Sequence, residues 1–244
     1  MRNFIGYINL TNMLRKVFFF LGLFLFPCLL IAQNPLDLLR GKGSSNSGEM
    51  VTGLKEALEK GTQAASGRLS KENGFLQDAA VKILLPPEAQ AVERTARQFG
   101  LGRQADQLIT SLNRAAESAC TDAGPIFITA IRQMNVTDAV SIVRGTDTSA
   151  TQFLRRTCSP QLTNQFRPVI EQALEKTGTT KLWRDFFSAT NRFSRNQVNT
   201  DLTAYVTDRA LQGLFHYVAA EEREIRKNPL ARTSDVLKKV FGQQ

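Results

Sequence analysis

Apolar residues recur at intervals of three and four along most of the chain beyond residue 50, which is the period of an α-helix with one buried face. The first such stretch predicts a helix from Val51 to about Ser70. The same spacing predicts longer helices over 101–123, 181–193 and 202–227. Helix packing is therefore the expected way for this chain to bury its apolar surface.

Glycine and proline divide the remaining sequence into shorter helices, because proline suits a first helical turn and glycine suits the residue after a last one. Ser159 and Pro160 are expected to start a new helix that ends at Gly178. Another predicted helix runs from Pro87 to Gly100, and a short one begins at Pro125. A third is capped by Thr137 and Asp138 and ends at Gly145, and two more cover 146–157 and 233–241.

Only one segment has the character of a strand. Residues 82–85 read KILL and stand before Pro86 and Pro87, and a residue that precedes proline avoids the helical region. There is no alternation of strands and no repeat of fixed period. The predicted fold class is all-α, a single globular multi-helix bundle of roughly nine to ten helices that follows a cleaved N-terminal signal peptide.

The signal peptide is predicted from the first part of the chain. Arg15 and Lys16 precede an apolar run over 17–32, which is too short for a confident membrane span and typical of a secretory leader. We expect cleavage after Ala32, so that residues 1–32 are removed and the mature protein is periplasmic, with no transmembrane span.

The start of the chain allows further predictions. Met13 stands directly before the basic residues and is a better-placed start than Met1. A lipid anchor at Cys28 is disfavoured, because Phe and Pro replace the small residues that such processing prefers. Glycine and serine make up most of 41–48, so 33–48 is predicted to be a flexible tether and 49–244 the helical domain.

Composition and charge are those of an ordinary globular protein. The chain has 244 residues, of which 42% are hydrophobic and 22% charged, and its net charge is +9. Removal of the leader takes away three basic residues and no acid, leaving 28 against 22, or +6. Basic residues could meet anionic lipid, glycans or nucleic acid, but they are spread among acids and lack interleaved aromatics. A solvated surface is the favoured interpretation, and nucleic acid is not expected as a partner.

Two cysteines remain after export, Cys120 and Cys158. An oxidising compartment allows them to form a disulfide, but spacing along the chain does not fix their distance. The alternative is a pair of buried free thiols that behave as small hydrophobic residues.

Several polar side chains stand on helix faces that are otherwise apolar, where burial costs free energy unless the groups are paired. Glu222 is the clearest, because it follows Val218 by four positions and precedes Arg226 by one turn. The full set is Asn113, Arg114, Glu117, Glu221, Glu222 and Arg226.

Two interpretations of this set stay open. The favoured one is an internal hydrogen-bonded network that fixes how two long helices pack. The other is a pocket between helices, in which a buried carboxylate with a raised pKa binds a polar ligand or acts as a general base.

Other chemistry is sparse. His216 is the single histidine, which excludes a histidine-rich metal site and argues against a catalytic triad. It lies beside the apolar stripe of its helix and is interpreted as a structural or surface residue. There is no phosphate-binding loop, dinucleotide-binding glycine pattern or nucleophile elbow, so no metal, cofactor or catalytic residue is predicted.

A set of collinear motifs spans residues 51–242. They read GLKEAL at 53–58, KILLP at 82–86, NRAAE at 113–117 and YVTDRALQGLF at 205–215, followed by IRKNPLART at 225–233. Together they resemble an exported bacterial family catalogued as domain of unknown function 4197. The resemblance implies no activity. Cys120 and Cys158 depart from the small residues expected there, and a joint change makes a disulfide somewhat more favoured.

These observations lead to three functional hypotheses. The first is an exported binding or structural component of the cell envelope, with an envelope protein or lipid as partner. The second is a carrier of an apolar or amphipathic ligand, in a cavity between helices lined by Phe186, Phe187 and Phe215. The third is an enzyme that uses Glu222 with Asn113 or Arg114.

Overall fold

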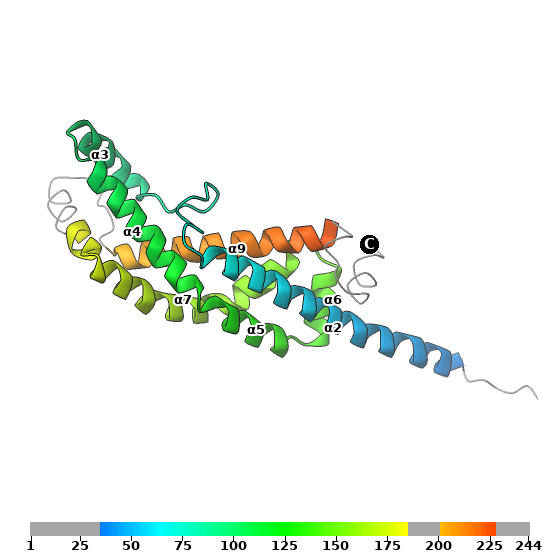
Figure 1. The fold of residues 1–244 in the computed structure, drawn as a ribbon. Coiled ribbons are helices and arrows are strands. Elements are labelled where there is room, and N and C mark those ends of the chain that lie inside the picture. Colours follow the sequence, from blue (N-terminus) through cyan, green and yellow to red (C-terminus); the bar gives the residue numbers. More distant parts are fainter. Residues whose placement is uncertain (1–34, 185–200, 228–244) are drawn as a thin grey trace, which may run out of the picture. The chain divides into compact units, whose positions relative to one another are not determined.

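The computed structural model describes residues 35–184 and 201–227, with side chains from residue 48 onward. Figure 1 shows the helices of these ranges. They are α2 (Pro35–Leu69), α3 (Pro87–Gln98), α4 (Gly102–Cys120), α5 (Ala123–Gln133), α6 (Val136–Val143), α7 (Ser149–Lys176) and α9 (Leu202–Lys227). Residues 179–184 are also helical, and no strand occurs in either range. The predicted all-α class is confirmed.

Some of the predicted helices lie outside the described residues. This holds for most of 181–193, for 233–241 and for the signal peptide at 1–32 together with Met13 and Cys28. The chain divides into two compact units between Gly43 and Ser44, and α3 and every later helix belong to the second unit. Helix α2 begins at Pro35 and so includes much of the stretch whose composition predicts a flexible tether. The division of the chain at residue 48 stays a prediction.

Helix α7 corrects the prediction of two helices over 146–178. It runs without a break from Ser149 to Lys176 and contains both Pro160 and Pro168. Its buried residues recur every four positions across both prolines: Leu154, Cys158, Leu162, Phe166, Ile170 and Leu174. Each proline removes one backbone donor, but packing of this stripe keeps the chain helical, so tertiary burial outweighs the local stop signal.

The start of α6 differs in a smaller way from the prediction. Asn135 is the N-cap, and its side chain accepts from the backbone N–H of Asp138. Asp138 completes a capping box by accepting from the backbone N–H of Asn135. Thr137 lies inside the helix, and the predicted cap was wrong by two positions.

The core is built around α4, α7 and α9, which pack on one another as Figure 1 shows. Helix α4 contributes Leu112 and Ala116, and α9 contributes Leu214 and Phe215, all at most 1% exposed. Phe215 packs edge-on against Phe127 of α5, with ring centroids 5.8 Å apart. Each large side chain buried in this way contributes about 1.5–3 kcal/mol.

A long irregular segment, 70–86, connects α2 to α3 and is called the strap from here on. Phe75 and Ile83 of the strap are completely buried. Phe75 lies over Gly213 of α9, where a Cβ atom would come within 2.6 Å of the phenyl ring. Glycine at 213 therefore allows the strap to lie directly against the backbone of α9.

None of the described helices is by itself long and apolar enough to cross a membrane. Helices α5 and α6 reach the necessary length and composition only together, and they are bent by 105° at the break between them. Their apolar side chains, such as Phe127, Ile131 and Ile142, are buried in the core.

Candidate functional site

The six polar residues singled out in the sequence fall into two groups in the structure. Asn113, Arg114 and Glu117 lie on α4 and bind the strap. Glu222 and Arg226 lie on α9 and bind the ends of α6 and α7. Glu221 is only partly buried, beside Gly61 of α2. No hydrogen bond between described residues joins the two groups directly.

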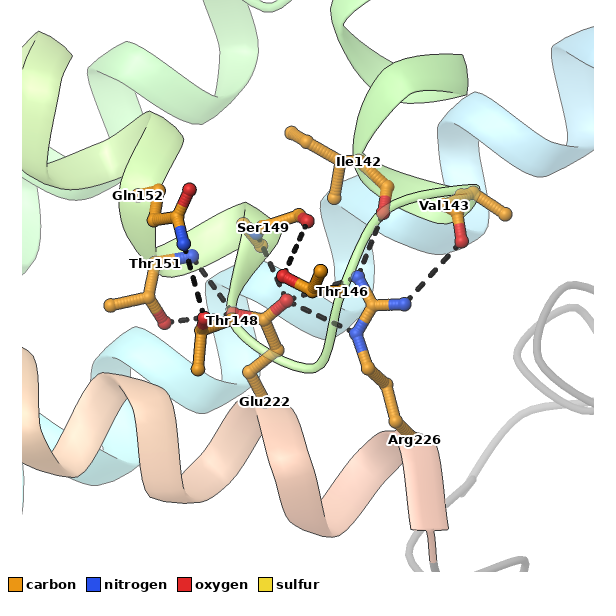
Figure 2. Close-up of polar contacts among 10 residues, drawn as sticks. Ile142, Val143, Thr146, Thr148, Ser149, Thr151, Gln152, Glu222 and Arg226 are labelled. Carbon is orange, nitrogen blue, oxygen red and sulfur yellow. Dashed lines mark hydrogen bonds and ion pairs between the residues drawn. The ribbon is translucent and has the colours of Figure 1, made fainter.

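Glu222 closes the first turn of α7. Its carboxylate oxygens accept from the backbone N–H of Ala150 at 2.9 Å and of Thr151 at 2.8 Å. One oxygen also accepts from the Thr151 hydroxyl at 2.8 Å. Helices leave their first N–H groups without internal partners, and a negative charge there interacts favourably with the helix dipole. Glu222 thus serves α7 as a cap from another helix, as Figure 2 shows.

Arg226 completes the arrangement at the end of α6. Its guanidinium donates to Glu222 from Nε at 3.1 Å and from Nη2 at 3.0 Å. It also donates to the carbonyl oxygen of Ile142 at 2.8 Å, where a helix C-terminus presents free acceptors. Both side chains are only 4% exposed. The carboxylate of the pair therefore binds the N-terminus of α7, and its guanidinium binds the C-terminus of α6.

The local sequence brings these two helix ends together. Only 144–148 separate α6 from α7, and Gly145 stands in this turn. A Cβ atom on Gly145 would lie 2.9 Å from the carbonyl oxygen of Ser141 and closer still to Ser149. Glycine thus allows the close approach that places both helix ends beside one turn of α9.

Glu222 does not stand in a reaction chamber. The space beside Glu222, Arg226 and Ala150 has a volume of about 10 Å³. A single water molecule needs roughly 10–15 Å³ measured in this way, so the space holds about one water at most. Both carboxylate oxygens are already engaged with α7 and Arg226. The geometry gives a substrate no room at this carboxylate.

Asn113 holds the strap in the manner of a neighbouring strand. Its Oδ1 accepts from the backbone N–H of Ile83 at 2.8 Å, and its Nδ2 donates to the carbonyl oxygen of the same residue at 2.8 Å. Nδ2 also donates to the carbonyl oxygen of Ile109. The predicted strand-like segment at 82–85 is therefore non-helical and paired with an amide side chain in place of a second strand.

Glu117 and Arg114 hold the first half of the strap. One Glu117 oxygen accepts from the backbone N–H groups of Phe75 at 3.0 Å and Leu76 at 3.2 Å. The other oxygen accepts from Arg114 at 2.6 Å. Arg114 in turn donates to the side chains of Glu72 and Asn73. The buried charge of Glu117 is thus satisfied by main chain and by one guanidinium.

Helix α9 also holds the strap, through residues that the sequence analysis did not single out. Tyr205 donates to the carbonyl oxygen of Leu84 at 2.8 Å, and Tyr217 donates to Asp78. Arg68 pairs with Asp78 at 3.0 Å and lies over the Tyr217 ring. Burial alone would raise the pKa of Asp78, but hydrogen bonds from Tyr217, the Ala80 N–H and Arg68 outweigh it and lower the pKa.

Glu221 carries a different electrostatic signal. Burial, and next to it the nearby carboxylate of Glu224, raises the pKa of Glu221 above its usual value, although Arg68 opposes the change. The residue lines none of the cavities beside either polar group. Its proximity to Gly61 explains its partial burial, since a Cβ at that position would meet Glu221 at 3.3 Å.

His216 and the described acids offer no metal site. His216 is exposed, with its ring edge-on to Tyr217. No group of three or more His, Cys, Asp or Glu side chains within 48–184 and 201–227 is placed to hold a metal ion.

An apolar hollow lies between α3, α4 and the helical residues 179–184. Its volume is about 200 Å³. Most of the side chains that line it are aliphatic, and one is the indole of Trp183. Among the described residues, Glu93 and Gln104 are the only lining residues with a charged or amide side chain. The lining consists of Leu85, Ala89, Val92, Glu93, Ala96, Leu101, Gln104, Ala105, Leu108, Leu182 and Trp183.

Only one of the residues expected to line a ligand cavity is described by the structure. Phe215, expected to line it, is 1% exposed and packed inside the core, while Phe186 and Phe187 lie outside the described residues. The helical period in 87–98 gives an apolar face to α3, but aliphatic residues on such a face look the same whether they fill a core or line a hollow. The sequence alone therefore does not single out these residues as the lining of a hollow.

Replacing Glu222 with Gln is predicted to lower the free energy of unfolding by about 3 kcal/mol, because Arg226 loses its buried partner and an amide N–H replaces an acceptor. Thermal and denaturant unfolding measure the change. Glu171→Gln, at an exposed position of α7, is the control and should stay within about 0.5 kcal/mol of the parent. Equal effects of the two changes would show that the carboxylate does not hold α7.

Cys120 and Cys158 are both buried free thiols in the structure. Burial raises the pKa of the Cys158 thiol to about 11 and that of Cys120 still further. Near pH 8 both are therefore protonated and poorly accessible, and thiol reactivity requires unfolding. The sequence left a disulfide open as the alternative.

Alkylation of the protein distinguishes buried free thiols from a disulfide. We predict slow alkylation of the folded protein near pH 8 and two modified thiols after unfolding without reductant, read by intact mass. Failure of both thiols to react until a reductant is added would reveal a disulfide.

Comparison with known proteins adds a family and no activity. Residues 44–242 match the family described as "Protein of unknown function (DUF4197)". No curated protein and no solved structure matches the chain. Since the family match covers far more than half of the 244 residues, the chain belongs to this family of unknown function.

Proposed function

We propose that the protein is exported to the periplasm and acts in the cell envelope as a binding protein, which takes the apolar end of an amphipathic ligand into the hollow between α3 and α4. The hollow itself carries this proposal. It is open to solvent, it has almost no polar lining, and it lies apart from the satisfied carboxylates.

The size of the hollow limits the ligand. A cavity of about 150 Å³ lined by Leu, Ile and Phe binds benzene, and sites for drug-sized molecules have about 300–1,000 Å³. A volume of about 200 Å³ therefore suits one short aliphatic segment or one aromatic ring. The polar part of such a ligand would remain in solvent, near Glu93 and Gln104 at the wall.

The polar groups support binding in preference to catalysis. Glu222, Glu117 and Asn113 are buried, and each binds main-chain groups of its own protein. A general base must reach a proton of a bound substrate, and these groups are directed at the strap and at α7. Asn113 and Glu117 hold the strap, which carries Leu85 of the hollow, and Glu222 holds the start of α7.

Trp183 makes ligand binding measurable, because it is the only tryptophan of the chain and lines the hollow. Bromine quenches indole fluorescence on contact, so we predict saturable quenching of Trp183 by ω-bromo-octanoate. Ala96→Phe fills the hollow from α3 and should weaken this binding about tenfold or more, a change of roughly 1.4 kcal/mol.

The matched control is Ala91→Phe, on the exposed face of the same helix, which should leave the quenching unchanged. Native mass spectrometry of the purified protein would add the identity of any ligand retained. Absence of saturable quenching in the parent protein would refute the function proposed here.

Export is tested separately. If residues 1–32 form a cleaved leader, the protein recovered from the periplasm has an intact mass that corresponds to 33–244, with Gln33 at its N-terminus. Substituting Leu21 and Leu23 by Arg should interrupt the apolar run and keep the uncleaved protein inside the cell. Recovery of the full chain with an intact leader from the cytoplasm would contradict export without affecting the binding experiment.

A further inference from the structure

Exposed apolar side chains gather on the segments around the hollow. Among the described residues, the large hydrophobic side chains that remain exposed are Leu84, Phe99, Leu101, Val136 and Leu182. All except Val136 lie on the segments that enclose the hollow: the strap, the turn between α3 and α4, and 179–184. Phe99 is the most exposed of them, at 80%.

The turn that carries Phe99 is well defined. Gly100 adopts φ of 82°, its N–H donates to the carbonyl oxygen of Arg97 at 3.1 Å, and the N–H of Leu101 donates to that of Ala96 at 2.9 Å. These are the two hydrogen bonds of a Schellman motif, which ends helices firmly. Figure 1 shows α3 and α4 joined by this short turn. Phe99 therefore projects from a fixed turn and not from a loose loop.

The segments that carry this apolar patch are rich in basic residues. Over 82–106 and 179–184 the chain has six Lys and Arg against three acids. Two of the acids, Glu93 and Asp106, are engaged by Arg97 at 2.8 and 2.7 Å. Arg94 and Arg103 are exposed and form no ion pair with a described residue. The local excess of charge is thus positive, beside a protruding aromatic ring.

We propose that this end of the molecule, with Phe99 and Leu101 at its centre and Arg94 and Arg103 beside them, docks on a bilayer surface rich in anionic lipid. An exposed aromatic or aliphatic side chain enters the boundary of the acyl chains, and each Lys or Arg near an anionic surface adds about a fivefold gain in association. The positive charge of these segments and the exposed phenyl ring together favour an anionic bilayer surface as the partner.

Docking on a bilayer would make lipid acyl chains available as the proposed ligand. Leu101 and Leu182 belong both to the exposed patch and to the lining of the hollow, so an acyl chain lying at the bilayer surface would meet the hollow's wall directly. This last step rests on the function proposed above. Docking itself depends only on the surface residues and is tested independently.

Cosedimentation of the mature full-length protein with vesicles tests the docking. Binding is expected to equimolar phosphatidylglycerol and phosphatidylcholine, to be much weaker on phosphatidylcholine alone, and to fall in about 0.5 M salt, because salt screens charges at a surface. Phe99→Ser should reduce the association constant about tenfold. The double change Arg94→Gln with Arg103→Gln should reduce it about twentyfold or more.

Matched variants make the outcome specific. Val136→Ser removes another exposed apolar side chain, from α6, and Arg144→Gln with Lys176→Gln removes two exposed charges elsewhere; both should bind vesicles as the parent does. Circular dichroism verifies that each variant is folded. Lack of binding to anionic vesicles, or equal losses in the Phe99 and Val136 variants, would overturn the docking surface.

Ala96→Phe separates the two proposals. With the hollow filled and Phe99 unchanged, this variant should bind anionic vesicles normally while losing quenching by ω-bromo-octanoate. In the parent, vesicles that contain phospholipid brominated near the chain end should quench Trp183. Vesicle binding without such quenching would leave docking in place and refute transfer of a lipid chain into the hollow.

Discussion

The carboxylate of Glu222 fixes the relation between three helices, because all of its hydrogen-bonding capacity is directed at one helix end and one guanidinium. Removing a carboxylate from water costs several kcal/mol, which poor geometry would not offset. Here two backbone N–H groups, a hydroxyl and Arg226 surround it at 2.8–3.1 Å. A shift of α9 along its axis would break these contacts together. The arrangement therefore does more than attract α9 to α6 and α7: it specifies a single way for them to pack.

Glu117 and Asn113 fix the position of the strap, as Glu222 fixes the position of the helices. An irregular segment of this length can lie inside a protein only if its main-chain groups find partners. Asn113 and Glu117 supply them from α4, and Tyr205 supplies one from α9. Because Leu85 follows directly after Ile83 and Leu84, these hydrogen bonds also place one wall of the hollow.

The pattern of the sequence predicts most of this fold and the burial of some of its polar groups. The helical period locates α9 at the observed bounds and α4 within a few residues, since long amphipathic helices repeat one signal many times. It is wrong at Ser159 and Pro160, where a local stop signal yields to burial on both sides. For Glu222 it identifies Arg226, one turn away, but not Ala150 and Thr151, whose sequence separation exceeds 70 residues. Partners that only the fold brings together leave no trace in spacing.

The exceptions to the usual apolar-inside pattern, a few buried polar groups and a few exposed apolar side chains, have physical consequences. Carboxylates lie inside, where satisfied networks oppose rearrangement, and a phenyl ring lies outside on a turn held by two hydrogen bonds. A flexible exposed aromatic could fold back on its own surface, but one fixed by a Schellman turn cannot readily do so. Water at its face remains until another apolar surface displaces it. Asn113 and Glu117 hold the strap, which forms one wall of the hollow, and a hollow keeps its shape for a ligand only when the elements around it do not collapse inward.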